Sequence, residues 1–283
     1  MSRVTRKLIV NADDFGISPS VNKAVIDCFI AGNVTSATMM VNMQGSVDAA
    51  RLAKDNPKLG VGLHFCLTEG RPLSRCPSLT GPGGAFLDRR TLLARALLGG
   101  VSREEIRAEL EAQLDRAADL GLSLTHVDSH QHVHMCPPIF PCVAETAARR
   151  GLALRVVRPP ISAGLLLSRP LKFTKQLVLT VNGALYRSAA GVRSNDRLIS
   201  IHDLPHGEPV GPAAYDRLLT SAAGSETVEL MVHPYILGDD LLALYGASLA
   251  SRLPNRCGEE YRTLSGPPLF SSKDLELTTY ASL

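Results

Sequence analysis

A buried-strand pattern opens the chain, in the stretch Lys7-Leu8-Ile9-Val10-Asn11-Ala12-Asp13-Asp14-Phe15-Gly16. The apolar run predicts a strand over residues 7–13, the paired acids mark its carboxyl end, and Phe15-Gly16 predicts a turn. Ser18-Pro19 then supplies a serine N-cap and an early proline, which predict a helix over about 21–31. The chain therefore begins with a β-then-α unit whose strand ends in carboxylates.

The same alternation continues along the rest of the chain, in roughly seven β-then-α units. Further strands are expected at 34–41, 59–65, 124–129, 153–158, 198–203 and 228–233, and further helices at 46–54, 89–98, 102–120 and 139–150. Such alternation without a break in composition is typical of parallel strands wrapped by helices. Polar residues end many different strands, which favours a distorted (β/α) barrel of about seven strands in one domain, residues 1–283, over an open sheet.

Two segments interrupt the regular alternation. Residues 66–88 contain three prolines and four glycines, and so long a loop within a compact domain is usually functional or mobile. A helical insertion is expected at about 163–190, where apolar and basic residues alternate. It is interpreted as a lid, an interface or a lipid-contacting helix, or as an ordinary barrel helix.

Composition excludes several classes of protein. The 283 residues are 45% hydrophobic and 20% charged, which excludes general disorder. A net charge of +3, only 5% aromatic residues and no tryptophan argue against a nucleic-acid partner. No apolar run approaches the roughly 20 residues of a membrane span, and no Gly-rich nucleotide-binding motif follows the first strand.

Cysteine usage and the N-terminus indicate a cytoplasmic protein. The first residues are basic, and only Leu8-Ile9-Val10 separates them from polar Asn-Ala-Asp-Asp, which is too short for a signal peptide. The six cysteines include no Cys-x-x-Cys pair, so they are expected to be reduced packing thiols rather than zinc ligands.

Four histidines crowd one short stretch, Thr125-His126-Val127-Asp128-Ser129-His130-Gln131-His132-Val133-His134. On an extended backbone alternate side chains share a face, so one side is expected to carry His126, Asp128, His130, His132 and His134. Gln131 is expected on the opposite face. Because so polar a face cannot be buried in a dry core, we expect it to line a wet pocket or hold a metal. An exposed edge strand that is rich in histidine is the alternative.

Two other predicted strands end in side chains that suit a metal. Asp13 and Asp14 close the first strand, and His64 closes the strand at 59–65. Imidazole and carboxylate together bind divalent metals, with zinc favoured by nitrogen ligands and magnesium, manganese or cobalt also compatible. One aspartate of an adjacent pair can bind the cation while the other stays free as a base. An anion pair at a helix N-terminus is the structural alternative.

Four segments of the chain resemble the signature of the YdjC-like carbohydrate deacetylases, a group that includes chitooligosaccharide deacetylases and is related to the NodB-type polysaccharide deacetylases. The segments are Asn11-Ala12-Asp13-Asp14-Phe15-Gly16, Gly62-Leu63-His64-Phe65, the stretch from Thr125 to Met135, and Val232-His233-Pro234. The first and third are specific, whereas His-Pro alone is a weak signal. This chain departs from the family in Tyr235, where relatives often carry a glycine after the proline.

The resemblance implies a distorted (β/α) barrel and a set of roles for residues of this chain. One divalent metal ion would be held by three ligands, Asp14, His64 and His130. Asp13 would act as general base and His233 as general acid in hydrolysis of an N-acetyl group on an amino sugar, releasing acetate. The residues expected to contact substrate or to orient the ligands are Asp128, His132 and His134. A homodimer is a further expectation from the family.

Arg155 and Arg158 lie at or near the end of the strand expected at 153–158. Arg158, next to Pro159-Pro160, is the better candidate than Arg155 for binding substrate hydroxyls or positioning Asp13, although a surface ion pair is an equal alternative. His202-Asp203 would either line the same mouth or form a capping pair.

Two other functions fit the same residues. A metal-dependent hydrolase could act on an ester or phosphoester, although two-metal phosphoesterases need more converging carboxylates than this chain offers. A sugar-binding protein with a metal but without turnover is the non-enzymatic alternative. The intact Asp13 beside Asp14 argues against it, because a binding protein has no need of a free base.

Overall fold

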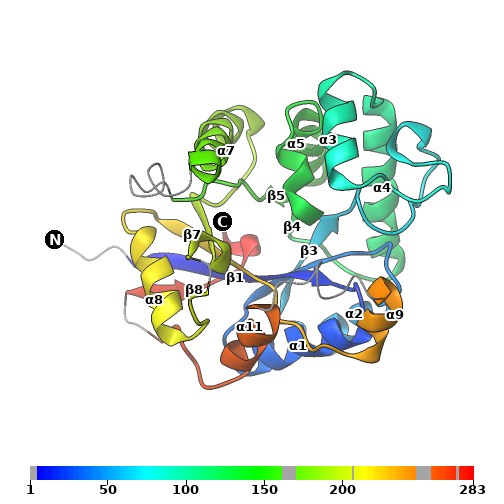
Figure 1. Ribbon diagram of the computed structural model, residues 1–283. Coiled ribbons are helices and arrows are strands. Elements are labelled where there is room, and N and C mark those ends of the chain that lie inside the picture. The colour runs from blue at the N-terminus through cyan, green and yellow to red at the C-terminus, as the bar shows by residue number, and fades with distance from the viewer. Residues whose placement is uncertain (1–4, 161–169, 206, 247–255, 272–273) are drawn as a thin grey trace.

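A curled parallel sheet runs through the computed structural model, which describes residues 5–160, 170–205, 207–246, 256–271 and 274–283 (Figure 1). Seven strands pair in the order β5-β4-β3-β2-β1-β7-β6, all parallel, and form the half-barrel that the alternation predicts. The strands are β1 (Arg6–Phe15), β2 (Ser36–Met39), β3 (Gly60–Phe65), β4 (His126–Ser129), β5 (Ala153–Leu154), β6 (Arg197–Ser200) and β7 (Thr227–Val232). An eighth strand, β8 (Leu275–Leu277), pairs with the first residues of β1 and carries no hydrophobic run that could have predicted it.

Helices surround this sheet, with α1 and α2 on one side and α5 and α7 on the other in Figure 1. They are α1 (Pro19–Ile30), α2 (Ser46–Asp55), α3 (Arg89–Leu97), α4 (Arg103–Asp119), α5 (Phe140–Arg150), α7 (Pro170–Ala190), α8 (Pro212–Ser221), α9 (Asp239–Tyr245) and α11 (Arg256–Leu264). The insertion expected at 163–190 is helical from residue 170, and its first part lies outside the described residues. Among the described helices, none is both long and apolar enough to cross a membrane.

The two end strands of the sheet are linked through the segments that flank them. Leu154 N–H donates to Arg193 C=O at 2.9 Å, and the Asn195 side chain bonds Val156 N–H and C=O at 2.8 and 3.0 Å. The strand expected at 153–158 is therefore shorter in the structure, where β5 covers only Ala153–Leu154. Beyond it, hydrogen bonds to the Asn195 side chain take the place of strand pairing, and Pro159 and Pro160 have no N–H to pair. The half-barrel is closed by irregular contacts rather than by a further strand pair.

The histidine-rich stretch departs from the predicted alternation. Strand β4 ends at Ser129, and a short 3₁₀ segment (His130–Met135) follows, in which Gln131 and His132 are left-handed, with φ of 56° and 57°. The prediction that five alternate side chains share one face is therefore wrong beyond Ser129. The chain turns there because Ser129 Oγ accepts a bond from His134 N–H at 2.9 Å.

His126 is buried inside the half-barrel rather than in a wet pocket. Its ring stacks on Tyr280, with centroids 4.1 Å apart, and Thr125 Oγ1 lies 2.9 Å from His126 Nδ1. Burial lowers the pKa of His126 to about 3, so the ring is neutral. A Cβ at Gly62 would lie 2.4 Å from His126 Cε1, so only glycine leaves room for this ring.

Gly62→Ala is expected to lower the free energy of unfolding by about 1–3 kcal/mol, because a methyl group would overpack the His126 ring. Urea denaturation measures the change. Gly83→Ala is the matched control, since its new Cβ would meet nothing within 4 Å. Equal destabilisation by the two substitutions would contradict the packing argument.

Candidate active site

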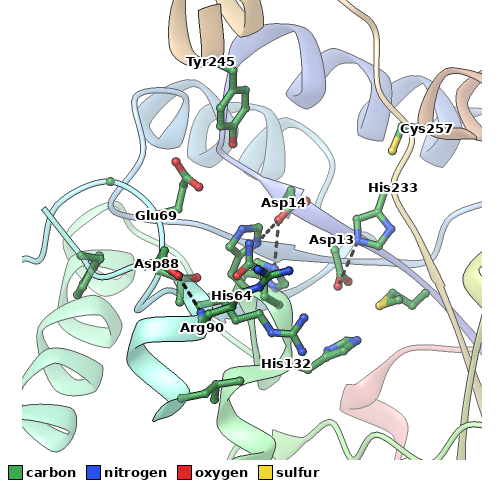
Figure 2. Close-up of a pocket in the computed structure, with 18 of the residues that line it drawn as sticks. Asp13, Asp14, His64, Glu69, Asp88, Arg90, His132, His233, Tyr245 and Cys257 are labelled. Atoms are coloured by element: carbon green, nitrogen blue, oxygen red, sulfur yellow. Dashed lines mark hydrogen bonds and ion pairs between the residues drawn. The ribbon is translucent and has the colours of Figure 1, made fainter. Parts of the chain in front are cut away.

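The predicted functional side chains gather at the carboxyl ends of the strands, where residues of parallel strands meet (Figure 2). Strand β1 supplies Asp13 and Asp14, strand β3 supplies His64, and strand β4 supplies Asp128. The 3₁₀ segment after β4 supplies His130, and the residue after β7 is His233. The sheet therefore brings together residues that lie more than two hundred positions apart in the chain.

Asp14 has an unusual backbone conformation that places two adjacent carboxylates in one cavity. Neighbouring residues of a regular strand point to opposite faces, but Asp14 has a φ of 66°, and the β1–β2 register shifts between Ala12 and Phe15. Asp13 and Asp14 consequently both line the cavity. A left-handed non-glycine residue costs about 1–3 kcal/mol and is typical of functional sites.

Asp14, His64 and His130 form a compact set of donor atoms. Asp14 Oδ1 lies 3.2 Å from His64 Nε2 and 2.9 Å from His130 Nδ1, and the three donor atoms all lie within 4.8 Å of one another. Burial alone would raise the pKa of Asp14, but the two imidazoles outweigh it and hold that pKa well below its usual range.

Asp128 holds the outer nitrogen of His64. Its Oδ1 lies 2.7 Å from His64 Nδ1, and both side chains are buried. Burial lowers the pKa of His64, but the Asp128 charge and the bonds to Asp128 and Asp14 reverse this and raise it to about 10. The protonated ring donates from Nδ1–H to Asp128 and from Nε2–H to Asp14 Oδ1, and a bound cation would take the place of the Nε2 proton. A carboxylate behind a histidine is the usual support of a metal ligand, so this donor set fits a divalent cation.

Arg155 lies at the centre of three buried carboxylates. It donates to Asp13 Oδ2 and Oδ1 at 2.7 and 2.6 Å and to Glu229 Oε1 at 2.8 Å from Nε, and it forms an ion pair with Asp128. Arg155 and Glu229 are fully buried, and Glu229 also accepts the hydroxyl of Tyr280. Burial raises the pKa of Asp13, but the Arg155 charge and hydrogen bonds outweigh it and lower that pKa far below 3.8. Asp13 therefore stays ionised.

His233 lies next to Asp13 in the lining of the cavity. His233 Nε2 lies 4.0 Å from Asp13 Oδ2, and the His202 ring centroid is 5.6 Å from that of His233 (Figure 2). The backbone N–H of His233 donates to Glu260 Oε2 at 2.9 Å. Burial raises the pKa of Glu260 to about 8. The α11 helix thus fixes the backbone that carries His233.

A cavity of about 860 Å³ opens beside these groups. The long loop at 66–88 forms one wall through Thr68, Glu69, Gly70, Ala85, Phe86 and Asp88, and α3 adds Arg89, Arg90 and Leu93. Tyr235, Tyr245 and Cys257 also line the cavity. This volume lies within the range of about 300–1,000 Å³ that small-molecule sites occupy. The loop is therefore part of the site, in agreement with the functional interpretation of its length.

Helix α4 holds that loop through buried side chains. The fully buried Glu109 accepts N–H bonds from Leu73 and Ser74 at 3.0 and 2.8 Å and the Ser74 hydroxyl at 2.6 Å. One turn further along α4, Gln113 bonds both backbone groups of Cys66 at 3.0 and 2.8 Å. The wall of the cavity is thus anchored to a helix.

Glu109→Ala is expected to loosen the loop, because the N–H groups of Leu73 and Ser74 would lose their acceptor. Trypsin should cleave several-fold faster after the exposed Arg75, and KM should rise while metal content stays unchanged. Glu111→Ala is the control, since Glu111 faces outward and pairs with Arg149 and Arg150. Unchanged proteolysis in Glu109→Ala would show that other contacts hold the loop.

The remaining predicted residues divide into two groups. His132 lines the cavity, and so does Gln131, which contradicts the prediction that Gln131 points away from His130. His134 is buried outside the cavity lining, where Nε2 lies 3.1 Å from Arg155 C=O and Ser129 Oγ lies 2.5 Å from Nδ1. Arg158 does not line the cavity, and it is Arg155 that contacts Asp13. His134 therefore supports the Arg155 backbone rather than the ligands.

Several residues of the site carried no recognisable sequence signal. Thr38 on β2 lies between two of the carboxylates, with its hydroxyl 3.3 Å from Asp13 Oδ1 and 3.1 Å from Asp128 Oδ2. Glu229 and Glu260 are fully buried acids. Only Glu229 carried a hint in the sequence, because it interrupts the apolar run of β7 and a carboxylate is rarely buried without a partner.

The half-barrel fold and the buried Asp-His-His set at its strand ends define a class of α/β proteins with a candidate metal centre. Within that class the chain belongs to the YdjC-like protein family, which it matches over residues 7–269. It is 37% identical to a carbohydrate deacetylase of Brevibacillus brevis over 87% of both chains. It is 39% identical to a chitooligosaccharide deacetylase of Proteus mirabilis over 83% of both chains.

Two further comparisons agree with this assignment. A carbohydrate deacetylase of Geobacillus stearothermophilus is 51% identical over 54% of this chain and 60% of its own length. A crystal structure of a proposed cellobiose-phosphate cleavage protein from Enterococcus faecalis V583 superposes with a TM-score of 0.76 at 24% identity, covering 98% of both chains. The latter similarity supports the fold alone.

Proposed function

We propose that this protein is a metal-dependent deacetylase that hydrolyses the N-acetyl group of an acetylated amino sugar or oligosaccharide and releases acetate. The observation that carries the proposal is the pair of adjacent carboxylates with different surroundings. Asp14 lies against two imidazoles, and Asp13 lies against Arg155 and opposite His233. The names of the curated relatives, carbohydrate deacetylase and chitooligosaccharide deacetylase, support the substrate class.

In this proposal Asp14, His64 and His130 hold one divalent metal ion. When bound, the metal would polarise the acetamide carbonyl and make a water molecule more acidic. Three protein ligands leave further coordination positions open, as a catalytic site requires. The buried Asp128 keeps His64 oriented from behind, His132 lines the cavity beside the proposed ligands, and His134 supports the Arg155 backbone.

Asp13 accepts the proton of the attacking water at Oδ2. Its Oδ1 already accepts bonds from Asn11 at 2.9 Å, Arg155 at 2.6 Å and Thr38 at 3.3 Å, whereas Oδ2 accepts one bond from Arg155. Oδ2 therefore keeps a lone pair on the side that faces His233. The His233 ring, next to Asp13, donates a proton from Nε2 to the departing amine. Amide hydrolysis needs both transfers, because an amine anion is a poor leaving group.

Acetate release from N,N′-diacetylchitobiose by metal-stripped and reloaded protein tests the proposal. Reloading with zinc, cobalt, manganese or magnesium should restore acetate release, at one metal ion per chain. p-Nitrophenyl acetate and p-nitrophenyl phosphate report on ester and phosphoester hydrolysis in the same samples. A protein that binds no divalent metal, or a metal-loaded protein that cleaves only the phosphoester, would overturn the proposal. A homodimer, the identity of the metal and a cytoplasmic location remain predictions of the sequence.

A further inference from the structure

Tyr235 is buried beside Asp14 at a position where this chain departs from the family signature. It follows His233-Pro234 directly after β7, is 3% exposed, and lines the cavity. Its hydroxyl donates to Asp14 Oδ2 at 2.6 Å, and its backbone N–H donates to Cys257 C=O at 3.2 Å. Tyr235 is therefore fixed at both its backbone and its side chain.

The two oxygens of Asp14 have different neighbours as a result. Oδ1 lies 3.2 Å from His64 Nε2 and 2.9 Å from His130 Nδ1. Oδ2 accepts the Tyr235 hydroxyl on the opposite side of the carboxylate. A carboxylate rotates easily about its last bond, and either oxygen or both can bind a metal. The Tyr235 bond selects one orientation of Asp14.

We propose that Tyr235 is a positioning residue for the metal centre, which holds Asp14 Oδ2 so that only Oδ1 is presented to a divalent cation between His64 and His130. The inference rests on the proposed function in so far as Asp14 must be a metal ligand. It assigns to Tyr235 a role that neither the histidines nor Asp128 performs, since Asp128 orients His64 and nothing else described orients the Asp14 carboxylate on that side.

The backbone around Tyr235 suits this role. Pro234 restricts the chain before it, and α11 holds the segment twice, through Glu260 to His233 N–H and through Cys257 C=O to Tyr235 N–H. A phenol ring has few rotatable bonds, so a fixed backbone fixes the hydroxyl. The segment His233-Pro234-Tyr235 thus contains both the proposed general acid, His233, and the residue that orients the proposed metal ligand, Tyr235.

Tyr235→Phe tests the inference through metal binding, without reference to activity. Loss of a partner behind a metal ligand typically weakens metal binding 10–100-fold, so the Kd of the apo protein for zinc should rise by about that factor. Isothermal titration calorimetry measures it. The visible spectrum of the cobalt-loaded protein should also change, because a freed carboxylate can bind through both oxygens.

Tyr261→Phe is the matched control. The Tyr261 hydroxyl donates to Asp27 Oδ2 at 2.9 Å, so the same oxygen atom is removed from a bond to a carboxylate that does not line the cavity. This variant should bind zinc with the Kd of the unsubstituted protein. Equal zinc Kd values for Tyr235→Phe and the unsubstituted protein, or equal losses in both variants, would overturn the inference.

A second substitution keeps the test decisive if Tyr235→Phe does not fold. Tyr235→p-aminophenylalanine retains a donor at the same position, so the zinc Kd should stay within a few-fold of the unsubstituted value. A loss of 10-fold or more in this folded variant would contradict the role of the hydrogen bond. Failure of the unsubstituted protein to bind zinc or cobalt at all would instead overturn the proposed metal site, and this inference with it.

Discussion

Asp13→Asn is expected to lower kcat for acetate release from N,N′-diacetylchitobiose by about 10²–10⁴-fold, the usual contribution of a general base. The amide has no lone pair of comparable basicity at the position of Oδ2, 4.0 Å from His233 Nε2. The protein should still bind one equivalent of metal, because the proposed ligands are untouched. Steady-state kinetics and metal analysis of the same preparation measure both quantities.

Asp88→Asn is the control for this experiment. Asp88 also lines the cavity, but its carboxylate caps α3 by accepting the N–H groups of Arg90 and Thr91, a task that asparagine also performs. Its kcat should stay close to the unsubstituted value. If Asp13→Asn instead loses the metal, Asp13 is a ligand and not the base. If the unsubstituted protein binds the sugar without turnover and Asp13→Asn binds it equally well, the protein is a sugar-binding protein.

Arg155→Ala should have the largest effect on stability, a loss of about 3–5 kcal/mol in the free energy of unfolding. The substitution leaves Asp13, Asp128 and Glu229 buried together without their shared cation. Arg155→Lys should recover only part of the loss, because one ammonium group cannot reproduce the paired bonds of the guanidinium to Asp13. Urea denaturation of the metal-free protein measures the change.

The pH dependence of this loss follows from the direction of the pKa changes. Arg155 holds the pKa of Asp13 below its usual range and opposes the rise that burial causes in Glu229. Without Arg155 burial dominates, and the folded-state pKa of both acids rises above the unfolded value. A carboxyl with a raised folded pKa destabilises the fold at higher pH and ceases to do so as pH falls through that pKa.

The difference in the free energy of unfolding between Arg155→Ala and the unsubstituted protein should therefore become smaller as the pH falls from 7 to 5. Arg158→Ala is the matched control, since Arg158 forms no ion pair with another described residue at the site. Arg158→Ala should lower the free energy of unfolding by much less, and that loss should not depend on pH in the same way. A pH-independent loss in Arg155→Ala would show that packing, rather than charge, accounts for the contribution of Arg155.

The repeating pattern of strands and helices was predictable because each unit carries its own hydrophobic period and caps. The Ser18 N-cap, the short β1 run and the acids at its end are all local features, and the structure confirms them. The convergence of Asp13, His64 and Asp128 was also predictable, since parallel strands align their carboxyl ends. Asp14 joins them only because its left-handed backbone and the β1–β2 register shift turn it toward the same cavity.

The remaining part depends on contacts between distant segments. Arg158 was the better candidate from the sequence, but the irregular closure beyond β5 directs Arg155 at Asp13 instead. Alternation misplaced His134 and Gln131 because a single serine hydroxyl turns the chain after β4. No strand or helix was expected beyond residue 233, so the contacts of Tyr235 and Glu260 were not predicted.

The bond between Tyr280 and Glu229 has a consequence for how the protein is made. Glu229 helps to hold Arg155, which in turn holds Asp13, and the Tyr280 ring stacks on His126 beneath them. Asp13 precedes Tyr280 by 267 positions, so the proposed base leaves the ribosome long before the tyrosine that completes its support. Until Tyr280 has been synthesised, Glu229 lacks its hydrogen bond to the tyrosine hydroxyl. Catalytic activity is therefore expected to arise only after Tyr280 has left the ribosome.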